Sequence, residues 1–236
     1  MTDNGIWDYP PDAPVVRDGS FTLTVINNPA PHEIQSLPQH DHARAREVAA
    51  SLVSVAGVAA ELGRRRATDR IVHDTRADLE QVRIGCWGPV TEISDPALAY
   101  RGGFFPLAEQ AEALAEQNPG AAVIGSARID FSIRYGAWIF IHPGGKHLWA
   151  EGWPGDDPWS VEGSVEDILG VFEAHTELDS DFDVDADPSV MDFSEVEDAV
   201  LGSLMPIDRR KRLLSTFRVE RTQEAAAHLE ETWLEE

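Results

Sequence analysis

Two histidines beside a predicted turn offer the most specific metal chemistry in this chain. The stretch Pro143 to Lys146 is expected to reverse the chain between two strands, so that His142 lies opposite His147. Two imidazoles at cross-strand distance can share a divalent cation or titrate together near neutral pH. The local sequence supplies no third ligand, since Glu151 lies about 13 Å further along the strand. The competing interpretation is a pair of histidines that flank a turn and bind nothing.

An acidic segment offers a second candidate cation site. Oxygen-bearing side chains occupy positions 1, 3, 5, 7, 9 and 12 of a twelve-residue loop: Asp181, Asp183, Asp185, Asp187, Ser189 and Asp192. This is the spacing of a calcium loop. However, Ala186 stands where the sharp turn favours glycine, and Asp192 is shorter than the usual bidentate glutamate. We therefore expect a solvated acidic linker and no cofactor, with a bound divalent cation as the alternative.

Histidine and carboxylate side chains also crowd one predicted strand pair, at His73, Asp74, Asp78 and Glu80. Such groups serve as general acids and bases in many hydrolases. No G-x-S-x-G, Cys/His or H-E-x-x-H signature accompanies them. The sequence leaves the question of catalysis open and favours a non-catalytic protein.

The charge of the chain is far from balanced. It has 42 acidic and 19 basic residues, a net charge of −23, and lysine only at Lys146 and Lys211. An acidic surface nearly free of lysine is typical of proteins that work in molar salt, where the Debye length is only about 3 Å. The alternative is an acidic protein from a GC-rich genome. Either way, the charge argues against binding to nucleic acid or anionic membranes.

The cellular location is constrained by two absences. Cys86 is the only cysteine, which excludes a disulfide within the chain. The N-terminus has no signal-peptide pattern, and the longest apolar run, residues 49–62, is too short to span a bilayer. We expect a cytoplasmic protein, or a virion component if the source is viral, that is not secreted by a signal peptide.

The elements around the histidines are predicted from strict alternation of apolar and polar residues between 128 and 135. Gly136 and Ala137 suit a two-residue hairpin turn. That turn would place Tyr135 opposite Trp138, and the next turn would place Phe140 opposite Trp149. One face of this meander would then be apolar and the other half solvated.

The rest of the pattern completes an α+β fold with a mainly antiparallel sheet flanked by helices. Strands are predicted at 21–26, 70–75 and 81–87, and helices at 42–62 and 107–117. Capping signals at Ser164 and Ser194 begin two further helices, followed by one at 209–214 and one at 219–233. We expect an irregular arm at 1–18, an α+β core at 19–152 and an acidic helical region at 160–236.

Large aromatic residues stand where the local sequence offers little core to bury them: Trp7, Tyr9, Trp153, Trp159 and Trp233. Such residues are enriched at the centres of interfaces. We expect them to dock on protein partners, in a homo-oligomer or a larger assembly. The alternative is that they fold back onto the sheet of their own chain.

The order of helix, paired strands, helix and strands over residues 42–150 is similar in outline to the tail-terminator proteins of long-tailed phages. This resemblance implies a structural protein, such as a neck or tail component of a haloarchaeal tailed virus. Two other classes stay open. One is a metal-dependent hydrolase that uses the histidines, and the other is a small intracellular acidic inhibitor or binding protein.

Overall fold

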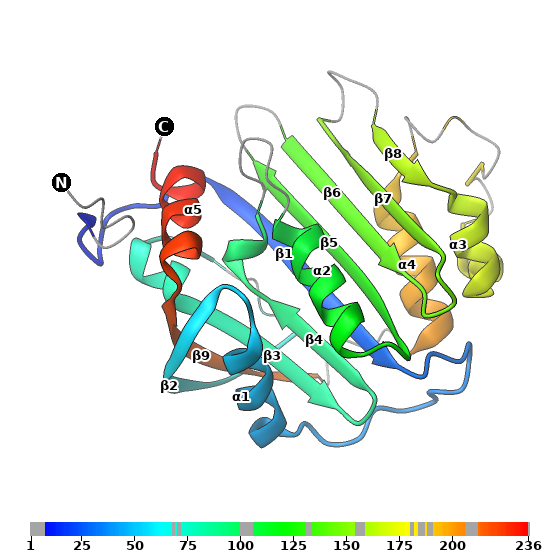
Figure 1. Cartoon of the computed structure of the whole chain (residues 1–236), viewed down its shortest axis with the longest axis horizontal. Helices are drawn as coiled ribbons and strands as arrows, with labels where there is room; N and C mark the ends of the chain where they lie inside the picture. Colours follow the sequence, from blue (N-terminus) through cyan, green and yellow to red (C-terminus); the bar gives the residue numbers. More distant parts are fainter. Residues whose placement is uncertain are drawn as a thin grey trace.

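The computed structural model describes residues 8–67, 69, 72–99, 106–130, 134–153, 159–179, 182–183, 187, 191–205 and 212–235. These residues form an α+β fold around one nine-stranded sheet of order β2-β9-β3-β4-β1-β5-β6-β7-β8 (Figure 1). Every neighbouring pair is antiparallel. The strands are β1 Asp18–Asn27, β2 Val55–Arg66, β3 Gln81–Trp87, β4 Val90–Ser94, β5 Ala121–Asp130, β6 Arg134–Ile141, β7 His147–Gly152, β8 Ser160–Gly163 and β9 Leu213–Arg221. The α+β class and the antiparallel sheet with flanking helices are confirmed.

Helices cover both faces of the sheet. On the front face, α1 His42–Ser51, α2 Pro106–Gln117 and α5 Gln223–Trp233 enclose one apolar core. On the back face, α3 Val165–Val171 and α4 Phe193–Leu204 enclose a second core. Because Leu23 faces one core and Ile26 the other, both faces of β1 are buried.

The helix predicted over 42–62 stops at Ser51, and its second half is the edge strand β2. The Asp41 side chain caps α1 by accepting hydrogen bonds from the amides of Ala43 and Arg44, as the sequence predicted. β2 pairs with β9 through three register shifts, so the strand lacks the regular alternation that identifies strands in sequence. The β-branched Val55 and Val58 were the available signal for a strand.

The predicted hairpin turn at residues 136–137 is also wrong. Gly136 lies within β6, opposite Arg128 on one side and Gly152 on the other. A Cβ atom there would come within 2.6 Å of the Trp138 ring, so glycine is required by close packing and not by a turn. Residues 131–133, which connect β5 to β6, lie outside the described residues.

The second turn is off by one residue. Phe140 pairs with Leu148, and Trp149 pairs with Ile139. A one-residue slip moves a side chain to the opposite face. Phe140 is thus fully buried in the back core, whereas Trp149 packs on the front core.

The C-terminal part contributes strands as well as helices. β9 lies between β2 and β3, where the sequence predicted the end of one helix and the start of another. Arg221 fixes its end: Nη1 lies 2.8 Å from Asp95 Oδ1, and Nε donates to the Leu79 carbonyl at 3.0 Å. β4 was not predicted. Of the strand expected at 70–75, residues 70 and 71 lie outside the described residues, and among 72–75 only Thr75 forms a bridge, to Pro14. The helix at 107–117 is confirmed as α2.

The N-terminal arm, described from residue 8, lies along its own chain. The Val15 amide donates to the Asp74 carbonyl, and the Val16 amide donates to the Trp233 carbonyl. Ala13 is buried beneath these contacts. The arm therefore joins the turn before β3 to the end of α5.

Candidate functional site: an acidic groove on the front face

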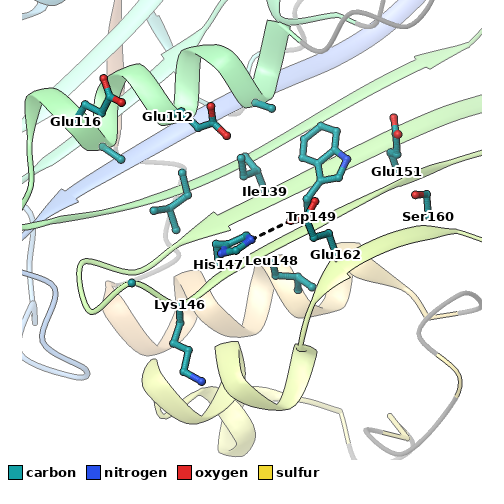
Figure 2. A pocket seen from close by; sticks show the side chains of 14 residues that line it. Glu112, Glu116, Ile139, Lys146, His147, Leu148, Trp149, Glu151, Ser160 and Glu162 are labelled. Atoms are coloured by element: carbon teal, nitrogen blue, oxygen red, sulfur yellow. Dashed lines mark ion pairs between the residues drawn. The ribbon is translucent and has the colours of Figure 1, made fainter.

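A depression lies between α2 and the outer strands β7 and β8, with a volume of about 660 Å³ (Figure 2). We call it the acidic groove. Its lining comes from α2, β6, the β6–β7 turn, β7 and β8: Ala108, Glu112, Ala115, Glu116, Ile139, Ile141, Gly145, Lys146, His147, Leu148, Trp149, Glu151, Ser160 and Glu162.

The groove exists because the sheet extends beyond its helical cover. α2 packs on β5 and β6. A helix covers about two strands, since helices pack 8–10 Å apart and strands about 4.8 Å apart. Figure 1 shows no described helix over the front of β7 and β8. The front of these two strands is thus left open beside α2.

The floor of the groove is apolar. Ile139 is buried, while Ile141 and Trp149 are half-buried and pack on the front core. They face the groove because Ile139 pairs with Trp149, so both side chains point to the front of the sheet. A half-buried tryptophan in a depression offers a large apolar contact surface.

The rim is acidic on both sides. Glu112 and Glu116 stand one turn apart on α2, and Glu151 and Glu162 face them from β7 and β8 (Figure 2). Glu151 Oε2 accepts a hydrogen bond of 2.7 Å from the Tyr135 hydroxyl. Neither Glu112 nor Glu116 has a hydrogen bond or ion pair within the described part of the chain. Like charges four residues apart destabilise a helix by about 0.2–0.5 kcal/mol, so this pair is a cost to the fold.

The nearby basic side chains leave the rim negative. Lys146 Nζ lies 2.6 Å from Asp167 Oδ2, and Figure 2 shows the side chain pointing down, away from α2. His147 Nε2 lies 3.5 Å from Glu162 Oε1, and both side chains are exposed. Further up α2, burial raises the pKa of Glu109, and the carboxylates of Glu224 and Glu112 raise it further. The groove therefore suits a ligand with cationic groups around an apolar body.

The predicted histidine pair does not form. His147 lies opposite Ile141, one position from the expected register. The His142 ring packs edge-on against Phe172, 5.0 Å away, and its Nδ1 accepts a hydrogen bond from the Gly144 amide. Burial lowers the pKa of His142. Among the described residues, no three His, Cys, Asp or Glu side chains are placed to hold a metal ion.

The proposed calcium loop is covered only in part. Asp181 and Asp185 lie outside the described residues, and Asp183 is exposed. Asp192 caps α4, accepting a hydrogen bond of 2.9 Å from the Ser194 amide. The helix cap predicted at Ser194 is thus corrected to Asp192. The expectation of a solvated acidic linker, with a bound divalent cation as the alternative, stays a prediction.

The aromatic residues expected at an interface have different environments. Trp7 lies outside the described residues, and Tyr9 is partly buried on the front core. Trp153 packs 5.1 Å from the Tyr135 ring, and Trp159 packs 5.2 Å from the Trp138 ring. Trp233 is fully buried and donates from Nε1 to the Pro96 carbonyl, so it is a core residue with no surface for a partner.

Sequence reasoning missed the acidic groove. The predicted helix at 107–117 already carried glutamates at spacings of three and four, which place Glu109, Glu112 and Glu116 along one side. Predicting that these glutamates lie beside an open sheet face required the correct register of β6 and β7, which the sequence did not provide.

Comparison with known proteins places the chain in one family. Residues 6–236 match the pattern of a family of unknown function, DUF6333. The chain belongs to DUF6333. No curated protein and no solved structure matches it. No described helix of this DUF6333 protein is long and apolar enough to cross a membrane.

Proposed function

We propose that this DUF6333 protein is a non-catalytic assembly protein whose acidic groove binds a basic amphipathic helix of a partner protein. The observation that carries the proposal is an apolar floor, Ile139, Ile141 and Trp149, enclosed between two rows of carboxylates. Amphipathic helices bind such grooves through apolar anchors three and four residues apart.

The dimensions of the groove favour a helix over an extended peptide. A helix packed beside α2 at the usual 8–10 Å would lie two strands further along the sheet. That position is above β7 and β8, whose front no described helix covers. The partner helix would continue the helical layer already begun by α2.

The rim would select the charge of the partner. Glu112 and Glu116 are one helical turn apart, so lysine or arginine residues one turn apart on the partner would meet them. An exposed ion pair contributes only about 0.2–1 kcal/mol. Affinity would therefore come mainly from covering the tryptophan and isoleucines, and charge specificity from the four glutamates.

The more specific form of this proposal is a neck or tail component of a virus from a salt-rich source, with homo-oligomers as its working state. It rests on the net charge of −23 and on the resemblance in element order to tail-terminator proteins. The half-buried Trp153 and Trp159 would supply subunit contacts. Light scattering in molar salt would return a discrete ring mass if this form is right, and a monomer mass if it is not.

The docking proposal is tested with a labelled model peptide. The peptide carries leucine at positions i, i+3, i+4 and i+7 and lysine at the flanking positions, and fluorescence anisotropy measures its binding. We expect saturable binding that is lost with Trp149→Ala and weakens as KCl rises, then levels off where only the apolar term remains. The matched control is Glu47→Gln, which removes one exposed carboxylate on α1, outside the groove.

Two results would contradict the proposal. One is the absence of saturable binding by the lysine peptide. The other is equal binding of a peptide in which every lysine is replaced by glutamate, because an acidic rim cannot accept both signs equally.

A further inference from the structure

A second depression lies on the back face of the sheet, beside α4, with a volume of about 130 Å³. We call it the polar hollow. Its lining comes from β1, β4, β5, α4 and the residue before β9: Ser20, Thr22, Thr24, Glu92, Ser126, Arg128, Glu197, Asp198, Leu201, Met205 and Arg212. It shares no lining residue with the acidic groove, so ligand binding at the two sites can be tested separately.

Polar residues converge here because of strand pairing. Thr24 pairs with Glu92, and Thr22 pairs with Ser126, so all four side chains point to the back of the sheet. The surrounding back core is apolar. Burying polar groups is costly unless they find partners, so a polar cluster in this layer is an informative feature.

The floor of the hollow carries both signs of charge. Arg212 Nη1 lies 3.4 Å from Glu92 Oε2, with 4% and 5% of the two side chains exposed. Beside them, Ser126 Oγ donates to Glu197 Oε1 at 3.0 Å. The floor is therefore a built, hydrogen-bonded surface of hydroxyl, carboxylate and guanidinium groups.

Two further lining residues, one of each charge sign, are exposed and form the mouth of the hollow. Arg128 extends from β5 and Asp198 from α4, and both residues are exposed. Neither has a hydrogen bond or ion pair to any residue that the structure describes. A guanidinium and a carboxylate are thus both available at the entrance of an otherwise enclosed polar space.

We propose that the polar hollow binds a small zwitterionic amino acid. Its carboxylate pairs with Arg128, its ammonium group pairs with Asp198, and the hydroxyls of Thr22 and Thr24 accept or donate further hydrogen bonds. The space holds about four water molecules at about 30 Å³ each, which limits the ligand to the size of glycine, alanine or serine. A purely anionic or purely cationic molecule would pair with only one of the two mouth charges.

The test is isothermal titration of the full chain with glycine, alanine and serine. Acetate, ethylamine and glycerol serve as anionic, cationic and neutral probes of similar size. We expect saturable 1:1 binding of at least one amino acid, and weaker or no binding of acetate, ethylamine and glycerol. Glycerol binding as tightly as the amino acids would overturn the proposal, as would the absence of saturable amino acid binding.

Substitutions at the two exposed mouth residues test binding separately from folding, because neither side chain is part of the buried core. Arg128→Gln and Asp198→Asn should each weaken binding about two- to fivefold without changing the melting temperature. The control Arg218→Gln removes an exposed arginine of β9 outside the hollow and should leave binding unchanged. Equal loss in the control, or undiminished binding in both mouth variants, would also overturn the proposal.

Discussion

The acidic groove and the polar hollow lie on opposite faces of one sheet and differ in every property that selects a ligand. The groove is wide, has an apolar floor and presents four carboxylates. The hollow is about a fifth of that size and lines its floor with hydroxyls and a buried ion pair. Alternation along the strands allows this difference, because neighbouring residues serve different faces. One face is thus suited to a protein segment, and the other to a small polar molecule.

Salt should produce the largest effect and should separate the two regions. With a net charge of −23, repulsion destabilises the fold in dilute buffer and is screened within about 3 Å in molar salt. We expect a large rise in melting midpoint between about 0.1 M and about 3 M KCl. Over the same range, peptide binding at the single-sign groove should weaken more than amino acid binding at the mixed-sign hollow. An unchanged midpoint would contradict the proposal that this protein is adapted to molar salt.

Core substitutions should distinguish the floor of the groove from the back core behind it. Phe140 is fully buried among back-core residues, so Phe140→Ala should cost about 3–5 kcal/mol of unfolding free energy. Trp149 is half-buried on the front, so Trp149→Ala should cost roughly 1–2 kcal/mol. Urea denaturation measures both losses. Equal losses would mean that Trp149 is a core residue and that the groove has no open floor.

The sequence predicted those elements whose signals are local. The helix cap at Asp41 and the helix at 107–117 were predicted correctly, because a cap and a hydrophobic period of 3.6 residues depend only on nearby residues. β2 was missed because its bulges break the alternation and its alanines favour a helix.

The candidate site depended on distant packing, which the sequence alone did not reveal. In the sequence, Gly136 has the features of a turn residue. In the structure it is a strand residue, and glycine is needed there because the Trp138 ring packs against it. The resulting error in register assigned Trp138 and Phe140 to the same face as Ile129, whereas they lie in the back core, and it joined two histidines that lie apart. The glutamates of α2 were visible in the sequence, but the open strands beside them were not.

A buried histidine provides a contrast with the exposed charged residues of the two depressions. His73 is 9% exposed between Phe21 and Trp233, and burial lowers its pKa to about 4 from 6.5. The folded state keeps it neutral while the unfolded chain gains a proton below pH 6.5, so stability falls as pH drops from 6.5 through 4. This should amount to about 3 kcal/mol.

His73→Leu removes that titration and should flatten the pH dependence of unfolding free energy between about pH 7 and pH 4 relative to the unaltered protein. An identical pH profile in the variant would mean that the histidine is protonated or solvated in the fold.

The smallest expected change in stability concerns the groove rim. Replacing both Glu112 and Glu116 by glutamine removes a like-charge pair and should stabilise the fold by about 0.2–0.5 kcal/mol. The same change should weaken binding of the lysine peptide about three- to tenfold. Glu47→Gln should produce neither this gain in stability nor this loss of affinity for the lysine peptide. A loss of stability in the double variant would mean that these carboxylates serve the fold and not a partner.

Reversing the charge of the α2 rim decides whether the acidic groove selects its ligand by charge. The double variant Glu112→Lys and Glu116→Lys is compared with the unaltered protein, each titrated with the lysine peptide and with its glutamate counterpart. We expect the unaltered protein to bind the lysine peptide at least about tenfold more tightly than the glutamate peptide, and the variant to reduce or reverse this preference. If both proteins show the same preference, the acidic groove does not select its ligand by charge and the proposed docking site is wrong.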